Sequence, residues 1–160
     1  YPSLEGTRPI LIEIQALVTN ANYNTAQRNV TGFNYKRLGM LTAVLEKRIG
    51  LAMGTKDIFV NLVGGLKIDD PAADLSIISA IASSTMDKYI EKDIILCGEV
   101  GLTGEVRSIS RLNQRITEAL SLGFKKAIVP SYGMKEKLKN VDMDLYPVKN
   151  VKETFKILFQ

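Results

Sequence analysis

Short apolar, β-branched segments alternate with segments of helical periodicity along most of the chain, and this alternation is the strongest constraint on its fold. The pattern predicts strands over residues 10–18, 58–63, 93–100, 127–130 and 145–148, and helices over residues 35–49, 71–85, 110–120, 132–138 and 151–159. Glycines within residues 101–104, followed by residues 105–107, predict a hairpin return. The expected class is therefore α/β, with helices packed on a mixed sheet.

The 160 residues are enough for one ordinary domain, and we predict it over residues 10–160. Residues 1–9 are polar and rich in turn formers, so the end of a linker is predicted there. Residues 20–34 are predicted to form a long polar connection. The sequence has no uninterrupted apolar stretch of the roughly 18 residues that a membrane span needs. A soluble, cytoplasmic protein without membrane contact is the expectation.

The residue types that are missing exclude several classes of enzyme. There is no histidine, which removes catalysis by Ser-His-Asp or Cys-His groups. Cys97 is the single cysteine and lies in an apolar run, so we predict a buried thiol and no zinc site. No phosphate-binding loop precedes Lys56, and Gly98, Gly101 and Gly104 favour a tight turn over a nucleotide site. We expect no metal or cofactor in this domain.

Two polar clusters leave a structural and a catalytic interpretation open. Asp69, Asp70 and Asp74 surround Pro71, where they are expected to cap a helix, although an acid/base pair or a magnesium site has the same composition. Ser76 and Ser79 follow on the same predicted helix. Without histidine, a serine nucleophile needs a lysine as its base, and no lysine is evidently paired with either serine.

Six segments spread along the chain carry the signature of a known family. They are Glu5–Pro9, Glu13–Val18, Val63–Lys67, Asp70–Leu75, Gly98–Arg107 and Ala127–Pro130. In this order they resemble the C-terminal domain of the bacterial RadA (Sms) DNA repair proteins. The resemblance implies the fold of the Lon protease domain, an α/β fold of the ribosomal-protein-like type.

The resemblance also implies that the Ser–Lys dyad of Lon proteases is absent. In those proteases the serine lies in a Pro-Ser-Ala-Gly motif, and the matching segment here is Pro71–Asp74, with Ala72 at the serine position. The lysine position is matched by Asn113. A methyl group cannot attack a carbonyl and an amide cannot accept a proton, so we expect no peptidase activity. The alternative is an active Lon-like peptidase that uses Ser76 or Ser79 as a non-standard nucleophile.

For the full-length protein, the resemblance implies a DNA-dependent ATPase with upstream RecA-like and zinc-binding modules, to which ATP, Mg²⁺ and Zn²⁺ belong. It implies that this domain supports DNA binding, of single or double strands, and assembly of a ring-shaped, hexameric homo-oligomer, with a recombinase as a further partner. The net charge of +4 is compatible with DNA contact and equally with an ordinary solvated surface or a pure assembly scaffold. The candidate DNA contacts are Arg28, Lys36, Arg37, Lys47, Arg48, Arg107, Arg111 and Arg115.

Overall fold

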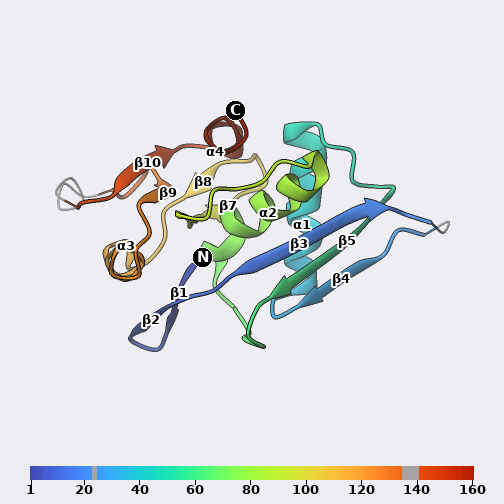
Figure 1. The fold of residues 1–160 in the computed structure, drawn as a ribbon. Helices are drawn as coiled ribbons and strands as arrows, with labels where there is room; N and C mark the ends of the chain where they lie inside the picture. The colour runs from blue at the N-terminus through green and yellow to red at the C-terminus, as the bar shows by residue number, and fades with distance from the viewer. Residues whose placement is uncertain (23–24, 135–140) are drawn as a thin grey trace.

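The computed structural model describes residues 1–22, 25–134 and 141–160, and Figure 1 shows their arrangement. One sheet contains β3 (Ile14–Asn20), β5 (Lys56–Leu62) and β4 (Arg28–Thr31), in the order β3-β5-β4. Strand β3 runs antiparallel to β5, and β4 runs parallel to it. The predicted α/β class with a mixed sheet is therefore confirmed.

A second sheet is wholly parallel and consists of β10 (Asp144–Val148), β9 (Lys126–Pro130) and β6 (Ile94–Leu96). Ala127, Ile128 and Val129 in its central strand are all buried, as expected for a parallel strand covered on both faces. The remaining strands of the described residues form two antiparallel hairpins. They are β1 (Pro2–Glu5) with β2 (Arg8–Leu11), and β7 (Glu99–Val100) with β8 (Val106–Arg107).

The helices begin and end where local capping groups allow. Helix α1 (Tyr35–Val44) begins at the cap residue Asn34, continues as a π-helical turn (Leu45–Ile49) and ends at Gly50, which has a left-handed conformation. A 3-10 turn (Pro71–Ala73) leads into α2 (Asp74–Met86). The other helices are α3 (Leu112–Ser121) and α4 (Val151–Leu158). Helix α2 lies at the centre of the molecule (Figure 1), which explains why most of its residues are buried.

Three predicted segments are corrected by the structure. The strand predicted over 10–18 is interrupted after Leu11, and its two parts join a hairpin and a sheet. The strand predicted over 93–100 is interrupted because the backbone of Gly98 turns to bond Ala72 and Leu75. The connection predicted over 20–34 contains β4, which was missed.

The N-terminal residues are also different from the prediction. Residues 1–9, predicted as a linker end, form most of the hairpin β1–β2, and Tyr1 is only 9% exposed. The hairpin packs against α3. Residues 132 and 133 form a turn, Met134 is in neither a helix nor a turn, and the rest of the helix predicted over 132–138 lies outside the described residues. Within the described ranges, no helix is long and apolar enough to cross a membrane.

Candidate functional site

The two positions that match the Lon dyad lie on elements joined by an ion pair. Ala72 is in the 3-10 turn before α2 and is 2% exposed, while Asn113 is exposed in the first turn of α3. Asp70, beside the first position, accepts a hydrogen bond from Arg115, two residues beyond the second, at 2.8 Å. The structure therefore links the two segments that resemble the dyad motifs, and a methyl group and an amide stand at the matched positions.

Arg115 is buried, with 1% of its surface exposed. Its guanidinium donates to the Tyr1 hydroxyl (2.8 Å), the Pro2 carbonyl (2.8 Å) and the Ser110 carbonyl (2.9 Å) as well as to Asp70. The structure gives no support to the prediction of Arg115 as a DNA contact, because its guanidinium is buried and donates inside the protein. This residue ties α3 to the N-terminal hairpin and to the start of α2.

Asp70 has two further donors. The Tyr1 hydroxyl donates to its carboxylate at 2.5 Å, and the backbone N–H of Ala72 donates at 3.1 Å. Burial alone would raise the pKa of Asp70, but these bonds and the Arg115 guanidinium outweigh it and hold the pKa below its ordinary value. Asp70 is thus an ionised cap and ion-pair partner, which favours the structural interpretation over general acid catalysis.

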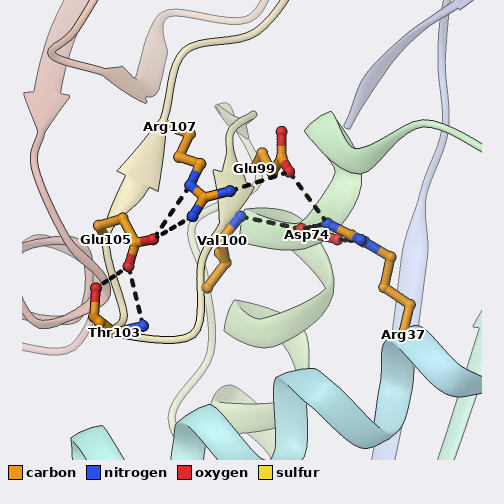
Figure 2. Close-up of polar contacts among 7 residues, drawn as sticks. All are labelled: Arg37, Asp74, Glu99, Val100, Thr103, Glu105 and Arg107. Carbon is orange, nitrogen blue, oxygen red and sulfur yellow. Dashed lines mark hydrogen bonds and ion pairs between the residues drawn. The ribbon is translucent and has the colours of Figure 1, made fainter.

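Arg37 from α1 and Asp74 from α2 form a second ion pair, shown in Figure 2. Arg37 donates through Nε at 2.5 Å and also through Nη2, and the backbone N–H of Val100 donates to the same carboxylate at 3.0 Å. The hydrogen bond to Asp74 raises the pKa of Arg37. Burial raises the pKa of Asp74, and the bonds that it accepts oppose that rise. The pair joins α1, α2 and the β7–β8 hairpin.

The β7–β8 hairpin extends this cluster with more carboxylates than cations. Arg107 pairs with Glu105 at 2.9 Å and lies 3.9 Å from Glu99, which is equally far from Arg37 (Figure 2). Glu105 also accepts bonds from the backbone and the hydroxyl of Thr103, and these lower its pKa. With Asp74, three carboxylates surround two guanidinium groups. The cluster therefore carries no excess positive charge for DNA.

Arg28 is another predicted contact that the structure uses internally. Its guanidinium donates to the backbone carbonyls of Met53 (2.8 Å) and Lys56, which fixes the loop before β5 against the start of β4. A guanidinium held by carbonyl groups keeps its charge but has fewer free donors for phosphate. The structure thus assigns Arg28 and Arg37 mainly to internal bonding.

The other predicted contacts are exposed, and they lie on the first helix and at the start of α3. Lys36 and Lys47 lie eleven residues apart at opposite ends of the first helix, roughly 16 Å along its axis. Arg48 donates to the Leu102 carbonyl at 3.3 Å, beside the hairpin. Arg111 donates to the Gly6 carbonyl at 3.0 Å and so lies next to the tip of β1–β2, far along the chain from the others.

A group of lysines at α4 was missed in the sequence. Lys152 and Lys156 have the i, i+4 spacing that puts residues on one side of a helix, and Lys149 lies two residues before the first helical residue. All three, called here the α4 lysines, are exposed. Within the described part of the chain none of them forms an ion pair. The spacing was visible in the sequence, so these lysines are the clearest omission from the predicted contacts.

Neither candidate serine is placed as a nucleophile. The Ser76 hydroxyl donates to the Leu96 carbonyl at 2.6 Å, and Ser79 is fully buried with no partner for its hydroxyl among the described residues. No lysine side chain in the described ranges donates to either hydroxyl or accepts from it. Burial raises the pKa of the Cys97 thiol to about 12, so this thiol is inert as well.

No metal site is formed by the described residues, which contain no group of three or more candidate ligands. Asp70 and Asp74, which the sequence placed in a possible magnesium cluster, each pair with a different arginine. Each carboxylate is therefore neutralised by a cation on a separate element. The two ion pairs account for buried Asp74 and half-buried Asp70.

The chain is similar to known proteins over nearly its whole length. A family model described as "Lon protease (S16) C-terminal proteolytic domain" matches residues 36–160. The DNA repair protein RadA of Aquifex aeolicus is 41% identical over 159 residues, which cover 99% of this chain and 35% of the relative. RadA of Bacillus subtilis is 44% identical over 154 residues, covering 96% and 34%. RadA of Streptococcus pneumoniae is 42% identical over 157 residues, covering 98% and 37%.

These matches extend through both ion-pair networks and both dyad positions. The chain spans about a third of the length of the curated relatives that it matches. It belongs to the family of Lon protease C-terminal domains and, within that family, corresponds to the Lon-like domain of the RadA DNA repair proteins.

Proposed function

We propose that this chain is a non-catalytic Lon-like domain of a DNA repair protein and that it contacts the DNA backbone through exposed lysines. The chief ones are Lys152 and Lys156 on α4 and Lys149 just before it. The observation that supports this proposal is a contrast between two groups of cations. These lysines have no carboxylate partner among the described residues, whereas Arg37 and Arg115 are bonded inside the protein. Phosphate contact needs accessible cations and depends little on base sequence.

The absence of peptidase chemistry is supported by more than two substitutions. Ala72 and Asn113 lack the nucleophile and the base, and Asp74 replaces the glycine of the Lon motif with a buried carboxylate held by Arg37. The two serines offered as substitutes have no base near them in the described structure. The alternative of an active peptidase therefore has no geometric support.

The remaining parts of the proposal concern the longer protein. We propose further properties of the longer protein from the sequence resemblance described above, since this chain covers about a third of its relatives. They are ring assembly, hexameric or otherwise, ATP with Mg²⁺ and Zn²⁺ in upstream modules, a recombinase partner and a cytoplasmic location. The DNA repair role is proposed from the name that these relatives carry.

The DNA proposal is tested by titrating fluorescent single- and double-stranded DNA with this chain across a salt series. For duplex DNA, each phosphate contact contributes about 0.9 to the slope of log affinity against log salt. Replacing all three α4 lysines with Gln is expected to weaken binding about tenfold or more and to reduce that slope by about 2 to 3. Replacing Lys36, Lys47 and Arg48 is expected to have a smaller effect.

The matched control replaces Lys67, Lys92 and Lys125 with Gln, which removes the same net charge from other exposed sites. We expect less than half the loss of affinity, because nonlocal charge is screened beyond roughly 10 Å at moderate salt. Equal losses in the α4 variant and the control would show that only net charge matters. No binding at low salt by the folded chain would reject the DNA proposal.

A further inference from the structure

The outer face of the β3-β5-β4 sheet has an unusual composition. Alternate residues of each strand point away from the helices, and the register puts Leu17, Phe59 and Asn29 in one row across the three strands. The next row contains Gln15, Asn61 and Thr31. The face thus has an apolar centre and is bordered by amides and a hydroxyl, a composition typical of contact surfaces more than of solvated strands.

This face is uncovered in the described structure. The inward residues Ile58, Val60 and Leu62 are buried, and the sheet packs against α1 and α2 on that side, as Figure 1 shows. On the outer side, Leu17 is 56% exposed and lies beside a shallow hollow of about 550 Å³. An exposed leucine beside an aromatic ring at the centre of a sheet is an unpartnered apolar surface.

The charge distribution restricts what can bind there. The chain has 21 basic and 17 acidic residues, yet the outward positions of these strands include just one charged residue, Asp57, which is buried and accepts a bond from the Gln27 N–H. A surface without cations is poorly suited to a polyanion such as DNA. It is suited to another protein surface that is uncharged as well.

A second copy of this chain meets that requirement. Two copies each carry a formal charge of +4 and repel one another, so they approach most favourably through a face without charge. Asn and Gln side chains both donate and accept hydrogen bonds, which lets an amide-bordered face pair with itself. Leu17 and Phe59 of one copy can then be buried against the same residues of the other.

We propose that the outer face of the β3-β5-β4 sheet pairs back to back with the same face of a second copy. The strands are four to seven residues long, so the flat area is about 300 Å², below the roughly 800 Å² per partner of stable complexes. The expected affinity is therefore weak, with a dissociation constant on the order of 100 µM.

This pairing is separate from DNA contact and from ring closure. A face that pairs with itself generates a two-fold axis, whereas a ring needs two different faces in contact. The pairing therefore joins two chains, or two rings, face to face. It places the α4 lysines outside the contact, since none of them lies on β3, β4 or β5.

The first test is sedimentation equilibrium of the chain from about 5 to about 500 µM, a range that brackets such an affinity. Leu17→Lys puts like charges opposite each other and is expected to weaken dimerisation at least tenfold. Leu122→Lys is the matched control, because Leu122 is 57% exposed on a different element. If Leu17→Lys does not fold, Asn61→Lys at the edge of the face replaces it.

The second test determines whether the same face of both copies takes part in the contact. Cys97 is buried, so Leu17→Cys introduces one accessible thiol per chain, and a short bis-maleimide is expected to join two copies at this position. Leu122→Cys is expected to remain monomeric under the same treatment. A monomer at every concentration, or equal behaviour of the Leu17 and Leu122 variants, would overturn the proposal. Single-stranded DNA binding that is lost in monomeric Leu17→Lys would assign the face to nucleic acid instead.

Discussion

The start of α2 and the surface of α4 use positive charge in opposite ways. At the start of α2, Arg37 and Arg115 are bonded to Asp74 and Asp70 and tie four segments of the chain together. On α4, Lys152 and Lys156 are exposed and form no ion pair within the described structure. Cations of the first kind stabilise the fold, and those of the second kind are available to a ligand.

The same contrast applies to the two segments that match the Lon dyad motifs. They lie here among ion pairs that hold α1, α2, α3 and the hairpins in place. Ion pairs with a buried partner are costly to break, because the partner left behind keeps its desolvated charge. The charged groups of this region therefore stabilise the fold, and the proposed DNA contact is assigned to the surface.

The largest effect is expected for Arg115→Met. The substitution leaves Asp70, the Tyr1 hydroxyl and the Pro2 carbonyl without their common donor, so the free energy of unfolding should fall by about 3 to 5 kcal/mol. Urea unfolding measures the loss. Asn113→Ala, an exposed change on the same helix, should cost no more than about 0.5 kcal/mol. A loss below about 1 kcal/mol for Arg115→Met would place this residue outside the structural centre.

A slightly smaller effect is expected for Arg37→Met. Asp74 would keep the Val100 N–H but lose its cation, at a cost of about 2 to 4 kcal/mol in the free energy of unfolding. Combining Arg37→Met with Asp74→Leu should cost less than the sum of the two single changes, because the pair is lost as a unit. Additive losses in the urea unfolding of all three variants would contradict the pairing.

The Asp70 carboxylate predicts a dependence of stability on pH. Its pKa in the folded state lies below the ordinary value of 3.8, so its contribution is fully present above 3.8 and is lost as the pH falls through the folded value. Asp70→Asn should cost about 1 to 2 kcal/mol at pH 7. Urea unfolding at neutral and strongly acidic pH should show the difference between wild type and variant shrinking in acid. A constant difference would mean that the charge of Asp70 contributes nothing.

No gain of activity is expected when the dyad residues are restored. The double variant Ala72→Ser with Asn113→Lys provides a hydroxyl and an amine, but Asp74, held by Arg37, still stands at the position of the motif glycine. Hydrolysis of labelled casein should stay at the background of the unchanged chain. Measurable hydrolysis by the double variant alone would show that the two substitutions were the whole of the loss.

Local signals made the helices predictable from the sequence. Strand pairing and side-chain bonds between residues far apart in the chain were not predictable in this way. The cap residue Asn34 and the stop at Gly50 lie within a few residues of the helix that they limit. Strand β4 is four residues long in a polar stretch, and it is a strand because β5 pairs with it. Arg115 looked like a surface cation because its partner Tyr1 is 114 residues away.

The candidate site was predictable in part for the same reason. Ala72 and Asn113 could be assigned from short motifs, since each motif is local. Which cations remain free depends on where every carboxylate and carbonyl lies in the fold, and that information is tertiary. The α4 lysines are the exception, because the spacing of Lys152 and Lys156 is itself a local signal that a helical-periodicity analysis of charges would have found.

The measurement that tests the central claim most directly compares DNA affinity and unfolding in the same variants. Replacing Lys149, Lys152 and Lys156 with Gln should lower the affinity for DNA and the salt slope while changing the free energy of unfolding by less than about 0.5 kcal/mol. Arg115→Met should lower the free energy of unfolding, and under conditions where it remains folded it should bind DNA with unchanged affinity. Loss of DNA affinity in folded Arg115→Met, with full affinity in the lysine variant, would contradict the account.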